Sequence, residues 1–137
     1  MVGILIVGHG AFGEALIHCA SHVLGARPPL VRQLGVTIHD DPEAVLPQAR
    51  ELVKQLDQGD GVLVFSDIFG ATPSNIATRL MVPGRVEGVS GVNLPMLIRA
   101  LTYREEALAA VTGKAISGGV AGVVQLNNGA GDAASRG

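Results

Sequence analysis

Two residues with the chemistry for group transfer, His9 and Asp67, each stand at the end of a short apolar run. A histidine can act as a nucleophile through one ring nitrogen, and a carboxylate that accepts a hydrogen bond from the other nitrogen fixes the tautomer. Thr72 adds a hydroxyl group shortly after Asp67. If these side chains meet, they suit transfer of a phosphoryl group through histidine, which depends mainly on positioning and charge stabilisation.

His9 lies between Gly8 and Gly10, where a predicted strand passes into a predicted helix. Residues 3–7 are continuously apolar, which is typical of a strand buried on both faces of a parallel sheet. The next apolar residues recur at helical spacing: Phe12, Leu16, Ala20 and Val23, with Leu24 beside them. The free N–H groups and the dipole of the first helical turn favour an anion, so Gly10 and Ala11 are candidate phosphoryl-binding residues.

The rest of the chain alternates between apolar runs and helical patterns. Strands are predicted over residues 30–36, 62–65 and 86–89, and helices from Asp40 or Asp41 to the turn at 58–61, from Thr72 to about 80, and over 97–116. Thr72, followed by Pro73, is a predicted N-cap. Pro47 is expected to kink or delay its helix, and breaks in the last helix are expected near Thr102 and Gly113.

This alternation predicts an α/β fold: a flavodoxin-like, doubly wound, mainly parallel sheet in the order 2-1-3-4, with helices on both faces. Residues 120–126 are a candidate antiparallel fifth strand at the edge. In such sheets ligands bind where the winding direction changes, which is between the first and third strands here. We therefore expect His9 to lie beside Asp67, Gly70 and Thr72, with Gly70 and Thr72 as further phosphoryl-binding candidates.

Composition limits the class of protein. The 137 residues are 47% hydrophobic and 3% aromatic, carry a formal net charge of -2, and contain no basic run, which excludes nucleic acid as an expected partner. Residues 1–126 are expected to form one domain, and residues 127–137 a disordered tail. With no basic leader and no apolar run of membrane-spanning length, we expect a cytoplasmic protein without direct membrane insertion. Cys19 is interpreted as a small core residue.

Three motifs together resemble the IIA domain of the mannose family of the bacterial phosphoenolpyruvate-dependent sugar phosphotransferase system. They are the apolar strand ending in His9, the sequence from Asp67 to Asn75, and the sequence from Gly91 to Leu97. The resemblance extends to about Leu101. It implies that His9 is phosphorylated, that Asp67 pairs with it and that Thr72 lines the site.

The resemblance also implies partners. HPr is the implied phosphoryl donor and a IIB component the acceptor, expected on a separate chain because no IIB domain follows. A homodimer that exchanges its last strand and an association with the membrane components IIC and IID are further implications. Phe69 and Asn93 are candidates for contacts with the site or a partner. No cofactor and no metal are expected.

Other functions stay open at this stage. The phosphocarrier subunit of dihydroxyacetone kinase shares the fold and the histidine, and a regulatory phosphoprotein would use the same chemistry without sugar transport. A dinucleotide-binding module is a third alternative, because Gly8, Gly10 and Gly13 match G-x-G-x-x-G after a strand. That module needs an acidic residue near the end of its second strand, where this chain has Gln33 and Leu34. His18, Cys19 and His22 have metal-binding spacing but are interpreted as surface or core residues.

Overall fold

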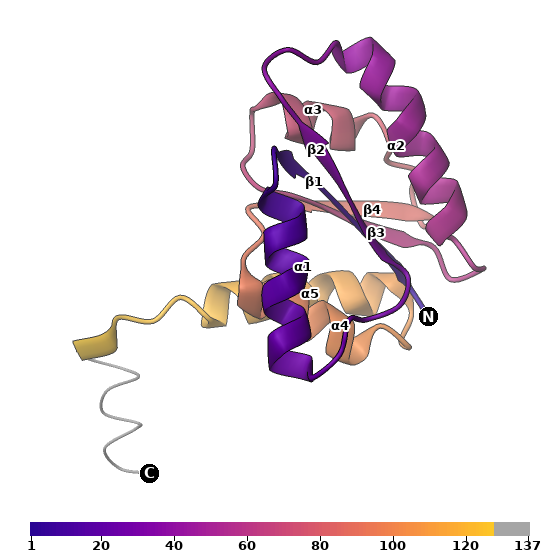
Figure 1. The fold of residues 1–137 in the computed structure, drawn as a ribbon. Helices are drawn as coiled ribbons and strands as arrows, with labels where there is room; N and C mark the ends of the chain where they lie inside the picture. The colour runs from indigo at the N-terminus through magenta and orange to yellow at the C-terminus, as the bar shows by residue number, and fades with distance from the viewer. Residues whose placement is uncertain (128–137) are drawn as a thin grey trace.

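The computed structural model describes residues 1–127, which form a four-stranded parallel sheet with helices on both faces (Figure 1). The strands are β1 (Gly3–His9), β2 (Val31–Val36), β3 (Val62–Ser66) and β4 (Val86–Ser90). Their order is β2-β1-β3-β4, and each neighbouring pair is parallel. The predicted fold class and strand order are confirmed.

Five helices connect and cover the strands: α1 (Phe12–Leu24), α2 (Pro42–Leu56), α3 (Thr72–Thr78), α4 (Leu94–Tyr103) and α5 (Leu108–Ala121). One core cluster joins the sheet to α1, α4 and α5, and a second joins it to α2 and α3. Within β1, Ile4 and Ile6 belong to the first cluster, whereas Leu5 and Val7 belong to the second. Both faces of β1 are therefore buried, which explains its continuous apolar run.

The predicted fifth strand is wrong within the described part of the chain. Helix α5 continues to Ala121, and the residues after it pair with no strand. A side chain at Gly118 would lie 2.7 Å from the Cβ of Arg99, and one at Gly119 would lie 2.5 Å from the Cε of Met96. These glycines allow α5 to pack closely against α4, so they are helical despite their low helix propensity.

The break predicted near Thr102 is close to the end of α4 at Tyr103, but the break at Gly113 is wrong because this glycine lies inside α5. Helix α2 begins directly at Pro42, and the Asp41 carboxylate caps it by accepting a hydrogen bond from the Glu43 N–H at 3.0 Å. Pro47 does not delay it. This proline removes only one helical hydrogen bond near the exposed start of the helix, which capping offsets.

The predicted apolar stripe of α1 is correct in part: Ala20 is buried and Phe12 and Leu16 pack against the core, but Val23 and Leu24 are exposed. The buried residues of α1 are Gly13, Ile17 and Ala20, whereas Val23 is 62% exposed. Cys19 is also exposed, so its interpretation as a core residue is wrong. Apolar or small residues occupy both candidate stripes, and the periodicity alone does not distinguish two faces that differ by one position.

The tail predicted over 127–137 lies, apart from Asn127, outside the described residues.

A buried arginine holds the amino end of the sheet together. Arg104, at the end of α4, is 5% exposed. Its guanidinium donates hydrogen bonds to the carbonyl oxygens of Val2, Pro29 and Leu30, at distances between 2.5 and 3.1 Å. These carbonyls lie just before β1 and β2, so one side chain connects α4 to the starts of two strands. Burial lowers the pKa of Arg104, but it remains a cation because an arginine starts far above neutral pH.

Candidate functional site

The structure brings His9 and Asp67 into direct contact at the carboxyl end of the sheet. His9 ends β1 and Asp67 follows β3, which is hydrogen-bonded to β1. The Nδ1 atom of His9 lies 2.7 Å from Oδ2 of Asp67, and the same oxygen accepts a hydrogen bond from the His9 N–H at 2.8 Å. The Ile68 N–H donates to Oδ1 at 3.0 Å. The carboxylate is thus held in one orientation relative to the imidazole ring.

The surroundings of Asp67 keep it ionised. Burial raises the pKa of this carboxyl, but hydrogen bonds from the His9 N–H and ring, the charge of His9 and the Ile68 N–H together lower the pKa below its usual range. An ionised carboxylate only accepts hydrogen bonds, so Nδ1 of His9 carries the proton. The lone pair then lies on Nε2, in a side chain that is 52% exposed.

Two glycines make this contact sterically feasible. A side chain at Gly8 would lie 3.0 Å from Cδ2 of Phe12 and 3.4 Å from Oδ2 of Asp67. A side chain at Gly35 in β2 would collide with the carbonyl oxygen of Gly10. The second glycine, which we did not identify from the sequence, lets the loop after β1 lie over β2. A glycine within a predicted strand was the available signal, because it often marks a close backbone approach.

The four predicted phosphoryl-binding residues differ in whether their hydrogen-bond donors are free to bind a phosphoryl oxygen. The N–H groups of Gly10 and Gly70 are already used, donating to the Val36 carbonyl at 3.0 Å and to the Ser74 hydroxyl at 2.9 Å. Both glycines have positive φ, 51° and 87°, so they shape their loops. Ala11 precedes α1, whose start has no side-chain cap, and its N–H has no partner within the described chain. The Thr72 hydroxyl also makes no hydrogen bond within the described part of the chain.

Thr72 is the first residue of α3, and the prediction that it is the N-cap is wrong. Ala71 occupies the N-cap position, and it makes no side-chain hydrogen bond. The Ser74 hydroxyl instead joins the loop to the helix, because it accepts from Gly70 and donates to the Ala71 carbonyl at 2.9 Å. Sequence reasoning missed Ser74, although a serine in the first turn after Thr-Pro was a visible signal for such a role.

The two candidates for contacts with the site or a partner have different environments. Asn93 is the N-cap of α4: its Oδ1 accepts from the Met96 N–H at 2.9 Å, and its Nδ2 donates to the Gly119 carbonyl at 3.0 Å. This side chain connects α4 to α5 and is half-buried. Phe69 is 84% exposed and lies two residues after Asp67. Of the two, only Phe69 is available for a partner beside His9.

Helix α1 carries two further histidines, His18 and His22, which are not part of the contact between His9 and Asp67. His18 and His22 pack edge to face, with ring centroids 4.9 Å apart. Over residues 1–127, no three or more His, Cys, Asp and Glu side chains come together in a way that could hold a metal ion. None of the helices in that range has both the length and the hydrophobicity to cross a membrane.

Comparisons with known proteins identify the family of this chain. The family model described as "PTS system fructose IIA component" matches residues 3–116. The mannose-specific EIIAB component of Escherichia coli strain K12 is 30% identical, with 82% of this chain and 38% of that protein covered. The fructose-specific EIIA component of Bacillus subtilis is 29% identical, with 77% of this chain and 72% of that protein covered. The chain therefore spans well under half of the mannose-specific relative.

A solved structure shows the same fold. The phosphotransferase system component EIIA from Streptococcus agalactiae superposes with a TM-score of 0.83 at 24% identity, covering 94% of this chain and all of that one. The family match covers most of the described residues, including His9 at the end of β1 and Asp67 directly after β3. On this evidence, the chain belongs to the IIA components of the phosphotransferase system.

Proposed function

We propose that this protein is a phosphocarrier of the sugar phosphotransferase system, in which His9 accepts a phosphoryl group from phospho-HPr and passes it to a IIB component. The observation that carries the proposal is the 2.7 Å contact between His9 Nδ1 and Asp67 Oδ2. This contact leaves Nε2 as the nucleophile at the open carboxyl end of the sheet. Family membership supports the same chemistry.

The transfer step follows from the tautomer. The Nε2 lone pair attacks the phosphorus atom, a nitrogen–phosphorus bond forms, and the bond between phosphorus and the donor breaks with its electron pair leaving on the donor. Because Nδ1 keeps its proton, the phosphorylated ring is cationic. The Asp67 carboxylate compensates this charge, and a cationic ring is a good leaving group when the acceptor attacks.

The phosphoryl oxygens need donors that are not already engaged. We propose that the Ala11 N–H, at the start of α1, and the Thr72 hydroxyl supply them, while Gly10 and Gly70 set the shape of their loops. The first turn of α1 has the unsatisfied N–H groups and the positive dipole end that favour an anion. The absence of a side-chain cap at this helix start supports the proposal.

The direct test is the intact mass of the protein after incubation with phosphoenolpyruvate, enzyme I and HPr. We expect one acid-labile phosphoryl adduct on the wild type and none on His9→Ala. His39→Ala is the matched control, because it removes another exposed histidine near the same end of the sheet and should keep the adduct. An adduct on His9→Ala, or none on the wild type with a cognate donor, would contradict the proposal.

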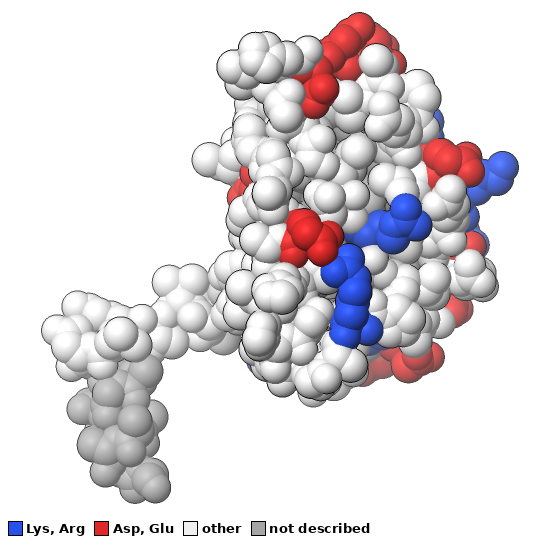
Figure 2. All heavy atoms as spheres, in the orientation of Figure 1, with Lys and Arg blue, Asp and Glu red and all other residues white. Residues whose placement is uncertain are grey.

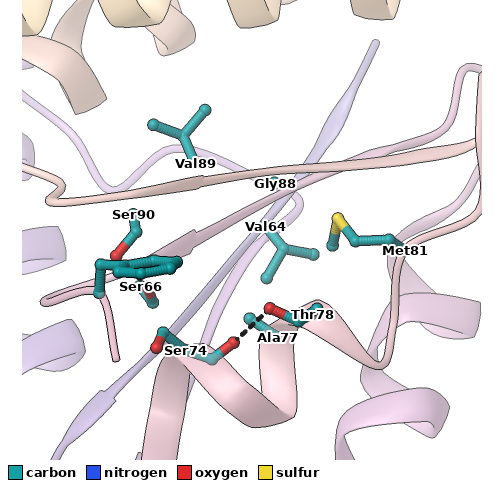
Figure 3. Close-up of a pocket in the computed structure, with 10 residues that line it drawn as sticks. Val64, Ser66, Ser74, Ala77, Thr78, Met81, Gly88, Val89 and Ser90 are labelled. Carbon is teal, nitrogen blue, oxygen red and sulfur yellow. Dashed lines mark hydrogen bonds between the residues drawn. The ribbon is translucent and has the colours of Figure 1, made fainter. Parts of the chain in front are cut away.

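We also propose a homodimer formed through the free edge of β4. Within the described residues, β3 is the only strand that pairs with β4, and Val82 adds an isolated bridge to Val86. Hollows flank β4 on both sides. One, of about 190 Å³, lies between α3 and the strands β3 and β4, with Val64, Met81 and Gly88 on its walls (Figure 3). The other lies between β4, α4 and α5. A strand added at this edge would direct alternate side chains into the two hollows.

The end of the described chain offers a segment for this edge. After α5 the chain leads away from the sheet (Figure 1). Apolar side chains are exposed in the last turn of α5, at Val120, and in the segment after it, at Val123, Val124 and Leu126. In a dimer, this segment of one copy would cover the β4 edge of the other. Val123→Asp should lower the mass measured by light scattering from dimer to monomer. Val23→Asp, on exposed α1, is the control and should leave the dimer intact.

A further inference from the structure

Two serines join the strand ends that lie next to Asp67. Ser66 is the last residue of β3 and Ser90 the last residue of β4, and the two are paired in register. A hydrogen bond of 2.9 Å connects their hydroxyl oxygens. Both side chains lie on the wall of the hollow between α3, β3 and β4 (Figure 3). We refer to Ser66 and Ser90 as the serine pair.

The backbone of Ser66 is held at the same place. Its carbonyl oxygen accepts hydrogen bonds from the N–H groups of Gly91 and Val92, at 3.0 and 3.1 Å. These bonds connect the chain after β4 to the last residue of β3, in addition to the bond between the hydroxyls. Asp67 follows directly, beyond the last paired residue of β3, so the position of its main chain depends on Ser66.

The hydroxyl of Ser66 is buried. Ser66 is 2% exposed and is one of three buried polar side chains in the described part of the chain, with Ser74 and Arg104. Those two side chains bind backbone groups, whereas the hydroxyl of Ser66 binds another side chain. Apolar residues of similar size at both positions would fill the space without the cost of burying a polar group. Stability alone therefore does not explain the serine pair.

The serine pair lies in surroundings without charge. None of the described residues that line its hollow is charged. Figure 2 shows the Lys, Arg, Asp and Glu side chains in small groups on the visible face, most of which is uncharged. In such surroundings a hydrogen bond is electrostatically stronger than in water, so the bond between the two hydroxyls can fix the strand ends relative to each other.

We propose that Ser66 and Ser90 are positioning residues that hold Asp67 against His9, so that the carboxylate keeps the proton on Nδ1 and leaves Nε2 free to attack. The proposal rests on the proposed function. The contact between His9 Nδ1 and Asp67 Oδ2 is 2.7 Å long and joins two separate strand ends. A displacement of about 1 Å at the end of β3 would take it out of hydrogen-bond range, and a misplacement of that size can cost about 10²-fold in rate.

A double variant separates positioning from stability. Ser90→Ala alone leaves the buried Ser66 hydroxyl without its partner, so it should lower both the stability and the rate of transfer. Ser66→Ala combined with Ser90→Ala removes both hydroxyls, and we expect its urea midpoint to stay near that of the wild type. We nevertheless expect transfer from saturating phospho-HPr to be about tenfold slower, with an unchanged KM. Phosphoramidate, a small donor that needs no docking surface, should show the same loss of rate.

Two further variants test whether the bond between the strand ends is the cause. Ser90→Thr keeps a hydroxyl group at the end of β4 and should transfer at the wild-type rate. Thr78→Val is the matched control, because it removes a hydroxyl from the same hollow that binds only within α3, to the Ser74 carbonyl at 2.8 Å. This control should also transfer normally.

Nitrogen-15 NMR of the unphosphorylated His9 ring measures the positioning itself. We expect a proton on Nδ1 in the wild type and a mixture of the two tautomers in the double variant. A double variant with the wild-type tautomer and rate would overturn the positioning proposal, while phosphate uptake by the wild type upheld the role of His9. An equal loss in Thr78→Val would also overturn it. Failure of the wild type with both donors would instead contradict the proposed function.

Discussion

The two ends of the sheet each carry a basic side chain, Arg104 at the amino end and His9 at the carboxyl end, but the two differ in burial and in how many of their hydrogen-bonding groups are engaged. At the amino end, Arg104 is buried, and its donors are used on the carbonyls of Val2, Pro29 and Leu30. At the carboxyl end, His9 is half-exposed and has one ring nitrogen engaged by Asp67. A buried side chain whose donors are engaged by backbone carbonyls stabilises the fold, whereas one that keeps a free lone pair near solvent can do chemistry.

Removing the buried group should have the largest effect on stability. Arg104→Met leaves buried carbonyl oxygens without donors, so we expect the free energy of unfolding to fall by about 3 kcal/mol. Urea denaturation would measure this change. The folded fraction should still take up phosphate, because Arg104 lies at the other end of the sheet. Arg50→Met, on exposed α2, is the control, and a loss as large there would remove the contrast between the two ends.

Changing the carboxylate beside His9 should affect the rate of transfer. Asp67→Asn can present its amide N–H₂ group to Nδ1, which would move the ring proton to Nε2 and block the nucleophile. We expect transfer from phospho-HPr to slow by about 10²-fold, within the range known for positioned acid–base groups. Rapid-quench kinetics would measure it. Asp60→Asn, in the loop before β3 at the other end of the sheet, is the control and should transfer normally.

A smaller change in the site tests how closely the carboxylate is fitted. In Gly8→Ala, the new methyl group would contact Phe12 and the Asp67 carboxylate, so we expect a loss of about 1 kcal/mol in stability together with slower transfer. Gly113→Ala is the matched control, because open space surrounds this position within α5. It should stabilise the protein by up to about 1 kcal/mol. Faster transfer by Gly8→Ala would contradict this expectation, because it would show that a methyl group at position 8 does not disturb the contact between Asp67 and His9.

The smallest expected effect is on the pH dependence of stability. The folded state lowers the pKa of Asp67, so its ionised form stabilises the fold above the ordinary carboxyl pKa of about 4. That contribution is lost as the pH falls through the lowered pKa. The difference in unfolding free energy between wild type and Asp67→Asn should therefore shrink in acid. A difference that grows below about pH 4 would contradict this sign.

The arrangement of the site was predictable because local signals agreed with the fold. Continuous apolar runs marked buried parallel strands, and the point where the winding direction changes placed His9 beside Asp67. The last element was not predictable, because Gly118 and Gly119 look like breaks until α4 is packed against them. Arg104 carried no signal, since its partners are backbone carbonyls distant in sequence.

The exposed residues were the hardest to assign. Nothing in the periodicity distinguishes the buried Ile17 from the exposed Val23, and Ile38 lies in a loop where burial has no pattern. Exposure of an apolar side chain depends on which elements pack over it, so it is a property of the tertiary structure.

The position of phosphate on the His9 ring tests the central claim most directly. Nitrogen-15 NMR of the phosphorylated protein distinguishes a phosphoryl group on Nε2 from one on Nδ1. We predict phosphate on Nε2, with Nδ1 still protonated and hydrogen-bonded to Asp67. Phosphate on Nδ1, or on a residue other than His9, would contradict the assignment of Asp67 as the group that selects the nucleophile.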